Sequence, residues 1–226
     1  VEYRLPGANQ IQVDRRAGLG FPDALRAVLR QDPDVVMVGE IRDRETAEIA
    51  MTAAVTGHLV LSTLHAADAT GAVTRLLNMG VPPFLVAGGL TGVVAQRLVR
   101  RCCRDCGAQG CTSCDEGLRG RTGVFQVLTL TDPLRDEISR GGASARLRSL
   151  AREAGMGRFA DDARRAVAEG LTTPHEISRA LHADPGASLP CRACGGSVPV
   201  GANACPSCGR IRRRICRCGT LLEAGW

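Results

Sequence analysis

Two short apolar runs, separated by a segment with helical spacing, constrain the fold of this chain more than any other feature. The runs are Val35–Val38 and Leu59–Leu64, and neither alternates between apolar and polar residues. Continuous apolar runs are typical of parallel strands that are covered on both faces. Parallel strands need a crossover, and Arg44–Val55 between the runs has helical character, with Asp43 as a plausible N-cap. We therefore predict an α/β fold, with a parallel sheet flanked by helices.

Further segments extend this plan along the chain. Apolar spacing predicts helices over 21–30, 68–79 and 84–96, and a short strand is expected at 11–13. Changes in composition then divide the chain. The predicted domains are an α/β core at 1–130 with a cysteine-rich knuckle at 102–122, a helical C-terminal subdomain at 131–183, a linker at 184–190 and a zinc-ribbon-like tail at 191–226.

The composition narrows the class of protein. Aromatic residues make up only 3% of the chain, so the core must be built from alanine, valine, leucine and isoleucine. All 29 basic residues are arginine, and the net charge of +6 bears on association with partners and not on the fold. We see no secretory signal and no apolar run long enough to span a bilayer. A cytoplasmic, reducing location is expected.

Eight of the eleven cysteines form four C-x-x-C pairs, which in a reducing compartment predict tetrahedral zinc sites. The first predicted Zn²⁺ site has the spacing C-x2-C-x4-C-x2-C and consists of Cys103, Cys106, Cys111 and Cys114. Four thiolates close the coordination shell, so we expect a structural site without catalysis. Cys102 is interpreted as a small buried apolar residue.

The second predicted Zn²⁺ site has the spacing C-x2-C-x10-C-x2-C and consists of Cys191, Cys194, Cys205 and Cys208. Gly195 and Gly209 follow the two pairs and permit the turns of a zinc ribbon. A protein-docking or structural role is favoured over nucleic acid, because Trp226 is the only aromatic residue nearby for base stacking. Arg212, Arg213 and Arg214 follow this site, and Cys216 and Cys218 have no assigned role.

The stretch DVVMVGEIRD (34–43) has the most chemical content. It predicts a buried strand that delivers the carboxylate of Glu40 to the carboxyl edge of a parallel sheet, where ligands bind. An acidic residue placed there in nucleoside triphosphatases organises Mg²⁺ and the attacking water. The stretch TGHLVLSTLH (56–65) sets His58 and His65 at the two ends of the next strand. Each histidine could instead cap a strand end by bonding a nearby carbonyl.

The order of these segments is informative. LRAVLRQDPD precedes DVVMVGEIRD, and TGHLVLSTLH, AQRLVRR and a tetracysteine knuckle closing with GRTGVFQVL follow it. This order resembles the C-terminal half of the ATPases that drive type II secretion and type IV pilus assembly, over about residues 1–181. In that family DVVMVGEIRD corresponds to the Walker B segment and TGHLVLSTLH to the His box.

The resemblance implies a RecA-like P-loop ATPase core that couples ATP hydrolysis to secretion or pilus assembly. It implies ATP and Mg²⁺ as cofactors, a homo-hexamer, a location peripheral to the inner membrane and membrane platform proteins as partners. Nucleic acid is not expected as a partner, because aromatic residues for base stacking are scarce near the basic tail. The resemblance assigns six residues to the nucleotide site. In this assignment Glu40 acts at the Mg²⁺ or the water, and His58 and His65 sense the phosphate. Arg30 stabilises the charge that develops during phosphoryl transfer, and Gly39 and Gly57 permit a close approach of the backbone to the nucleotide. The alternative for Arg30, and for Arg26 on the same helix, is a solvated face.

The family's P-loop, G-x-x-x-x-G-K-[ST], does not occur in this chain, which has no lysine. The family carries that motif upstream of an acidic segment whose tail Val1 and Glu2 resemble. We expect that these 226 residues alone neither bind ATP tightly nor hydrolyse it. The alternatives are a truncated, non-hydrolytic paralogue and a zinc-ribbon module that binds protein or nucleic acid. His175, Glu176 and His182 lack the H-E-x-x-H spacing of a metalloprotease and are interpreted as part of a surface helix.

Overall fold

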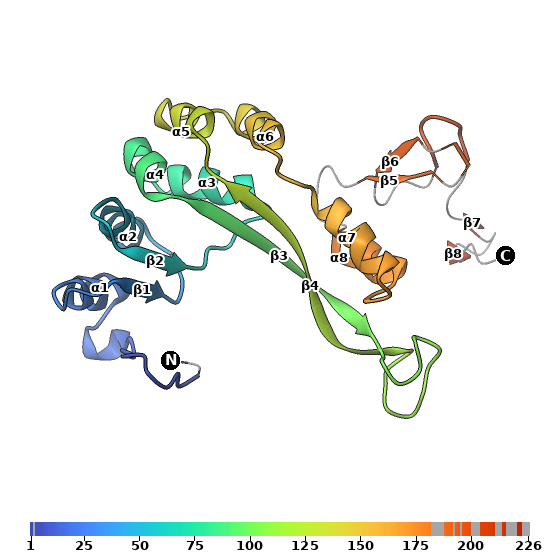
Figure 1. Ribbon diagram of the computed structural model, residues 1–226, viewed down its shortest axis with the longest axis horizontal. Coiled ribbons are helices and arrows are strands. Elements are labelled where there is room, and N and C mark those ends of the chain that lie inside the picture. The colour runs from blue at the N-terminus through green and yellow to red at the C-terminus, as the bar shows by residue number, and fades with distance from the viewer. Residues whose placement is uncertain are drawn as a thin grey trace. The chain divides into compact units, whose positions relative to one another are not determined.

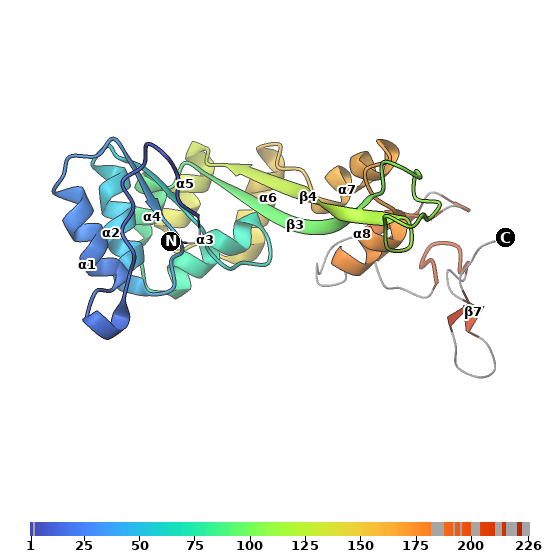
Figure 2. The ribbon, with the colours of Figure 1, turned by 90° about the horizontal axis from the view of Figure 1, so that it is seen from below.

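The computed structural model describes residues 1, 3–181, 188–191, 193–194, 196–199, 204–210, 214–215 and 221–222 (Figures 1 and 2). It contains two compact units. The first comprises Val1–Val93 and Val127–Met156, and the second comprises Val94–Gln126 and Gly157–Trp226. Several residues singled out in the sequence lie outside the described residues, namely Glu2, His182, Gly195, Arg212, Arg213, Cys216, Cys218 and Trp226.

The first unit is built around a pair of parallel strands. Its elements up to residue 89 are the short 3-10 helix η1 (Arg15–Ala17), α1 (Phe21–Leu29), β1 (Val35–Val38), α2 (Arg44–Val55), β2 (Leu59–Ser62), α3 (Ala69–Asn78) and α4 (Pro83–Gly89). β1 and β2 pair in parallel, with Val36 opposite Val60 and Val38 opposite Ser62, and α2 forms the crossover between them. The predicted α/β fold with a parallel sheet is confirmed.

Helix N-caps explain where two of these helices begin. The side chain of Asp43 accepts a hydrogen bond from Thr46 N at 2.8 Å, and that of Asp68 accepts one from Gly71 N at 2.6 Å. Each carboxylate satisfies a backbone N–H that the first helical turn leaves unpaired, and its negative charge complements the helix dipole. The sequence therefore determines locally where α2 and α3 start.

Only one face of the strand pair is covered by the described residues. Val36 and Val38 are buried, whereas the four apolar side chains of the other face are about half exposed or more, namely Val35 (55%), Met37 (68%), Leu59 (54%) and Leu61 (50%). The expectation that both strands are buried on both faces is wrong for this structure. α1 contacts β1 and α2 contacts β2, so the covered face is the one that these helices pack against.

A second correction concerns residues 84–96. The predicted helix ends at Gly89, and β3 (Gly92–Cys102) follows and pairs with β4 (Leu118–Thr129), which runs in the opposite direction (Figures 1 and 2). Burial alternates along β3 with the two-residue period of a strand, although its apolar residues include the consecutive Val93, Val94 and Ala95 and so do not alternate themselves. A Cβ on Gly89 would lie 2.9 Å from Met51 O, so this glycine lets α4 approach α2 closely. The strand expected at 11–13 is not formed; residues 11–13 have no regular structure.

Within residues 131–181, all of which the structure describes, four further helices follow β4, in keeping with the helical character expected for this region. α5 (Asp132–Ser139) and α6 (Ser144–Glu153) belong to the first unit, and α7 (Phe159–Ala168) and α8 (Pro174–Leu181) to the second. The division between the units falls within β3 and β4 and separates these helices into two pairs. The domain boundaries at residues 130, 183 and 190 stay predictions.

The second unit has its own apolar core, made by Val99, Val124, Phe159, Ala163 and Ile177. The guanidinium of Arg97 lies 5.3 Å from the centroid of the Phe159 ring. Two short antiparallel pairs lie toward the C-terminus, β5 (Ser188–Pro190) with β6 (Ser197–Pro199) and β7 (Arg214–Ile215) with β8 (Leu221–Leu222). Among the described helices, none is both long enough and apolar enough to cross a membrane.

Candidate functional site

Three polar side chains meet at the carboxyl edge of the parallel strands. Glu40 follows the end of β1, and its Oε2 lies 2.6 Å from Arg42 Nε and 3.9 Å from His65 Nε2. His65 comes from the segment after β2, and its side chain is 94% exposed, against 25% for Glu40. The structure therefore brings Glu40 and His65 together, and it adds Arg42, to which the sequence analysis gave no role.

Hydroxyl groups hold the two strand ends in register beyond the paired residues. Thr63 Oγ1 donates to Gly39 O at 2.7 Å and Ser62 Oγ donates to Val38 O at 2.9 Å. Ile41 N donates to Thr63 O at 3.0 Å, which continues the backbone pairing past the last residue of β1. These bonds fix the backbone on both sides of Glu40, and so its position beside the segment that carries His65.

The side chains of this cluster can bind an anionic ligand, such as a phosphate, together with a cation that is bound to it. The Glu40 carboxylate can offer oxygen to a hard cation or accept a proton from water, and the ion pair with Arg42 at 2.6 Å holds it in place. The imidazole of His65 can donate a hydrogen bond to a phosphate oxygen, and its exposure leaves it accessible. Ligands of open α/β sheets bind at this edge.

His58 lies at the other end of β2, at its amino edge. Its Nδ1 is 3.0 Å from Ala53 O and 3.4 Å from Thr56 Oγ1, so the ring caps the C-terminal end of α2. The strand β2, which is about 13 Å long at 3.3 Å per residue, and two further residues separate His58 from His65. The structure thus supports the capping alternative for His58, and brings only His65 to Glu40.

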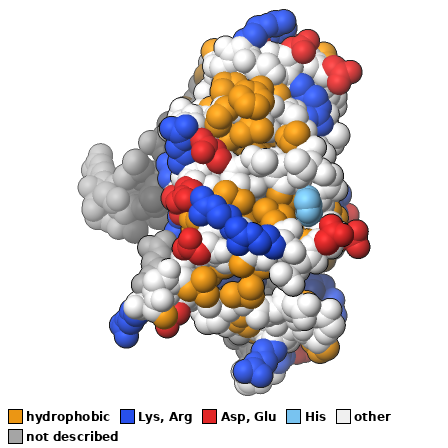
Figure 3. Space-filling model, turned by 90° about the vertical axis from the view of Figure 1, so that its left-hand side faces the viewer, with side chains coloured by type: hydrophobic (Ala, Val, Ile, Leu, Met, Phe, Trp, Pro, Cys, Tyr) orange, Lys and Arg blue, Asp and Glu red, His pale blue; other side chains and the backbone are white. Residues whose placement is uncertain are grey.

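His58 also borders a cavity between α1 and α2. The cavity has a volume of about 320 Å³ and is lined by Leu29, Glu48, Ile49, Thr52, Ala53, Thr56 and His58. Apolar patches lie among charged side chains on the side of the molecule where α1 and α2 lie (Figure 3). Because this cavity is at the amino edge of the strands, it is distinct from the Glu40 cluster.

The two arginines of α1 are not brought to Glu40. Arg30 is the exposed C-cap residue of α1 and precedes the amino end of β1. Arg26 Nη2 lies 2.6 Å from Glu45 Oε1 at the start of α2. The role of Arg30 in stabilising charge therefore stays a prediction, as does close backbone approach at Gly39 and Gly57. Gly57 has φ +108°, which explains a glycine there by backbone conformation alone.

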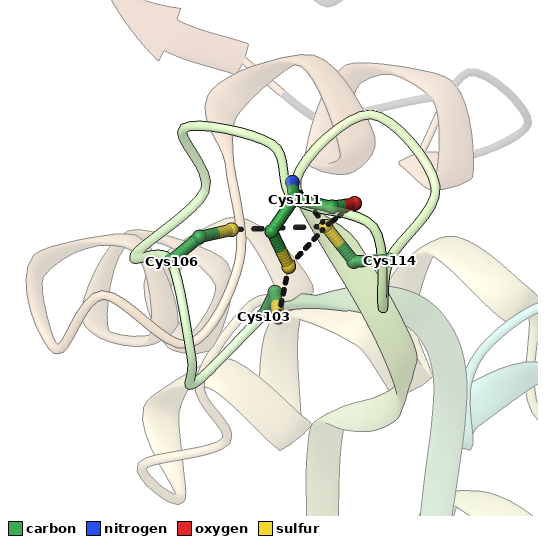
Figure 4. A group of neighbouring side chains, drawn as sticks. All are labelled: Cys103, Cys106, Cys111 and Cys114. Atoms are coloured by element: carbon green, nitrogen blue, oxygen red, sulfur yellow. Dashed lines mark hydrogen bonds between the residues drawn. The ribbon is translucent and has the colours of Figure 1, made fainter.

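The loop between β3 and β4 carries the first four-cysteine group, whose thiols point toward one another (Figure 4). The Sγ–Sγ distances are 3.9 Å for Cys103–Cys111, 3.7 Å for Cys106–Cys114 and 3.5 Å for Cys111–Cys114. Zinc–sulfur bonds of about 2.3 Å give a tetrahedron with edges of about 3.8 Å, whereas disulfides need about 2.0 Å. The spacing therefore suits a tetrahedral metal ion and not a pair of disulfides.

An ion cluster centred on a buried glutamate connects the base of this loop to α8. Glu176 is fully buried and accepts hydrogen bonds from Arg100 Nη2 at 2.7 Å and Arg179 Nη2 at 2.8 Å. These two bonds, with that of Arg100 the stronger, lower the pKa of Glu176 to about 2. Arg100 Nη1 also lies 3.1 Å from Oδ2 of Asp115, the residue after Cys114.

The interpretation of residues 175–182 as part of a surface helix is therefore wrong at Glu176. The sequence did contain a signal for the burial of Glu176, because this residue lies on the apolar face of the helix, beside Ile177 and one turn before Ala180. Its partner Arg100 lies 76 residues away, which no local pattern reveals.

The same spacing of thiols recurs in the second four-cysteine group. Cys191 Sγ lies 3.7 Å from Cys208 Sγ, and Cys194 Sγ lies 3.7 Å from Cys205 Sγ. In each group the four Sγ atoms lie within 4.8 Å of one another.

Comparison with known proteins assigns this chain to a protein family. The family model described as type II/IV secretion system protein matches residues 1–179. The type II secretion system protein HxcR of Pseudomonas aeruginosa is 51% identical over 188 residues, which cover 79% of this chain and 40% of HxcR. The chain belongs to the type II/IV secretion system protein family. The resemblance inferred from the motif order is confirmed.

Other members of the family extend this result. The type IV pilus assembly ATPase PilB of Thermus thermophilus is 43% identical over 78% of this chain and 23% of PilB. Among solved structures, the pilus retraction motor PilT with bound ADP is 29% identical, with a TM-score of 0.57, over 74% of this chain and 44% of that chain. The ATPase DotB of Yersinia pseudotuberculosis has a TM-score of 0.58 at 24% identity, over 74% of this chain and 42% of that chain, and supports the fold alone.

The matched range shows which of the features described above belong to the part of the chain that the family shares. The chain spans about two fifths of the length of the first curated relatives, HxcR and the type II secretion system protein E of Pseudomonas aeruginosa. Residues 1–179 include the Glu40 cluster and the first four-cysteine group, whereas the second group lies beyond the match.

Proposed function

We propose that this chain is part of an ATPase that serves type II secretion or type IV pilus assembly, and that Glu40 and His65 belong to its nucleotide site. The observation that carries the proposal is the cluster of Glu40, Arg42 and His65 at the carboxyl edge of a parallel strand pair. The names of the relatives support it, since they include a type II secretion system ATPase and type IV pilus assembly ATPases.

Each residue of the cluster has a distinct part in this proposal. Glu40 would orient the attacking water or help to hold Mg²⁺, and Arg42 keeps its carboxylate in place. His65 donates a hydrogen bond to a phosphate oxygen and responds to its charge. Mg²⁺, when bound with ATP, would offset the negative charge of the phosphates. His58 supports the fold at the opposite edge.

These 226 residues supply only part of a nucleotide site. The chain has no G-x-x-x-x-G-K-[ST] motif and no lysine, so the contacts to the β- and γ-phosphates must come from other sequence. The exposed strand face formed by Val35, Met37, Leu59 and Leu61 supports the same conclusion, because a two-stranded sheet with one bare apolar face is marginal by itself.

The proposal extends to assembly and location. We propose a cytoplasmic homo-hexamer that works on inner-membrane platform proteins, with the chemistry converted into movement between subunits. What supports it is membership of the family and the charged surface of α1, where the exposed Arg30 is available to a neighbouring subunit.

We also propose a structural Zn²⁺ in the first four-cysteine group. The sulfur spacing and the backbone N–H groups aimed at sulfur support it, with Gly110 N 3.3 Å from Cys106 Sγ and Cys111 N 3.2 Å from Cys114 Sγ. Such hydrogen bonds stabilise thiolates, and four thiolates leave no open coordination position. The ion would hold the tip of the β3–β4 hairpin together.

The test is ATP turnover of the native protein isolated from its source, with Glu40→Gln as the variant. The variant keeps the size and hydrogen bonding of the side chain but removes the charge, and we expect turnover to fall at least about 100-fold with the oligomeric state unchanged. Glu45→Gln is the matched control, because Glu45 is exposed and pairs with Arg26 away from the cluster. Full turnover in Glu40→Gln would overturn the proposal.

A non-hydrolytic paralogue is the second candidate, and the missing P-loop motif of the chain favours it. The intact mass and N-terminal peptide of the native protein separate the two. A native protein that carries the motif supports the ATPase, and one without it supports a subunit that joins the assembly without hydrolysing ATP.

A further inference from the structure

We propose that residues 188–210 form a second zinc module, which folds around one Zn²⁺ and lies beyond the part of the chain that the family accounts for. The ligands are the four thiolates of Cys191, Cys194, Cys205 and Cys208. The family match ends at residue 179, so membership of the family does not assign this site. The inference does not depend on the proposed ATPase function.

The sulfur geometry suits a single tetrahedral ion. The Sγ–Sγ distances between the two loops are 3.7 Å for Cys191–Cys208 and 3.7 Å for Cys194–Cys205. The edge of a zinc–sulfur tetrahedron is about 3.8 Å when the bonds are about 2.3 Å. Each distance joins a cysteine of the first loop to a cysteine of the second, so an ion at the centre would cross-link the loops.

An equivalent backbone hydrogen bond closes each of the two loops. Cys191 N donates to Gly196 O at 2.8 Å, and Cys205 N donates to Arg210 O at 2.9 Å, so each loop is closed by a bond from its first cysteine to the residue five positions later. Ala193 N also points at Cys191 Sγ, at 3.4 Å. Two equivalent C-x-x-C loops that face each other make a closed four-thiolate shell, which is characteristic of structural zinc.

The two loops approach each other so closely that there is no room for a side chain at Gly196. A Cβ on Gly196 would lie 2.6 Å from Ser207 Oγ and 2.9 Å from Ser207 Cβ, closer than real contacts allow. Gly196 therefore permits the contact between the loops that brings the four sulfurs within reach of one ion. A substitution there alters the site while leaving every thiol in place.

Apolar burial is too small to fold this module. Within the described part of the module, the buried apolar cluster contains Val198 and, besides it, only the ligands Cys191 and Cys205. β5 and β6 contribute three paired residues each, and a two-stranded hairpin of that size is marginal in water. Metal binding then supplies the folding free energy, as it does in other small metal-held domains.

The test is the zinc content of the full chain, purified without added chelator and measured by mass spectrometry of the elements. We expect two zinc ions per chain, and one in the double variant Cys194→Ser/Cys208→Ser, which removes the two exposed ligands. Cys102→Ser is the matched control, because Cys102 belongs to neither four-cysteine group, and it should keep both ions. Two ions in the double variant, or iron in place of zinc, would overturn the assignment.

Hydrogen exchange of the same proteins tests the folding role. In the double variant, amides of residues 188–210 should lose their protection while those of α5 and α6 keep theirs. Gly196→Ala, which retains all four thiols, should release one of the two ions at a lower chelator concentration than the unaltered chain. Unchanged protection in the double variant would show that the module folds without its metal.

Discussion

Arg100 donates to Glu176 across 76 residues of sequence, with its Nη2 2.7 Å from Oε1 of a carboxylate that has no exposed surface. The same guanidinium reaches Asp115, beside the last cysteine of the first four-cysteine group. One arginine thus joins β3, the hairpin loop and α8 within the second unit.

The first prediction concerns the stability that this contact provides. Glu176→Gln leaves Arg100 and Arg179 without their shared counter-charge, and we expect the free energy of unfolding to fall by about 2 kcal/mol. The measurement is urea unfolding of the full chain. Glu169→Gln is the control, because Glu169 is an exposed partner of Arg165 and its loss should cost less than about 1 kcal/mol. Equal losses in the two variants would contradict a special role for Glu176.

The second prediction is a pH dependence with a defined sign. The hydrogen bonds from Arg100 and Arg179 lower the pKa of Glu176 to about 2, from an ordinary value of 4.5. Because the unfolded chain binds the proton more tightly, the contribution of Glu176 is complete above about pH 5 and is lost as the pH falls toward about 2. The difference in stability between the unaltered chain and Glu176→Gln should therefore shrink over that range. A constant difference, measured by unfolding at several pH values, would refute this.

The third prediction separates the two histidines. His58→Ala removes the cap on Ala53 O and should lower the free energy of unfolding by about 1 kcal/mol, whereas His65→Ala should not, since that side chain is 94% exposed. In the native protein, His65→Ala should reduce ATP turnover. The two measurements are thermal unfolding and turnover of both variants. The assignment fails if His65→Ala is the more destabilising variant or keeps full turnover.

The fourth prediction concerns the first four-cysteine group. Cys106→Ser/Cys114→Ser should abolish zinc binding there, and hydrogen exchange should accelerate in residues 103–117 while α1 and α2 are unaffected. The physical reason is that the ion closes the loop between β3 and β4, and Cys103 N–H already bonds Gly117 O at the base of that loop. Cys102→Ser is again the control. Unchanged exchange at residues 103–117 would show that the loop is held by hydrogen bonds alone.

Local signals predicted the elements that depend on neighbours in sequence. Asp43 was predicted as the N-cap of α2, and the structure shows the same kind of cap at Asp68 for α3, because in the first turn of a helix a side chain lies close to the backbone N–H three residues later. The two C-x-x-C pairs of each group predicted the metal-type clusters for the same reason. Where the pattern was ambiguous the prediction failed: the apolar residues between 92 and 96 fit a helix or a strand, and only pairing with β4 decides for the strand.

The sequence by itself determined the α/β plan, the carboxylate at the end of β1 and the spacing of the thiols, since each follows from interactions over a few residues. Only the tertiary structure decided that His65 joins Glu40 while His58 caps α2, that the described residues leave one face of the β1–β2 pair exposed, and that Glu176 is buried against Arg100. These outcomes depend on which elements pack together, and packing brings together groups that are far apart in the chain and whose interaction no local period records.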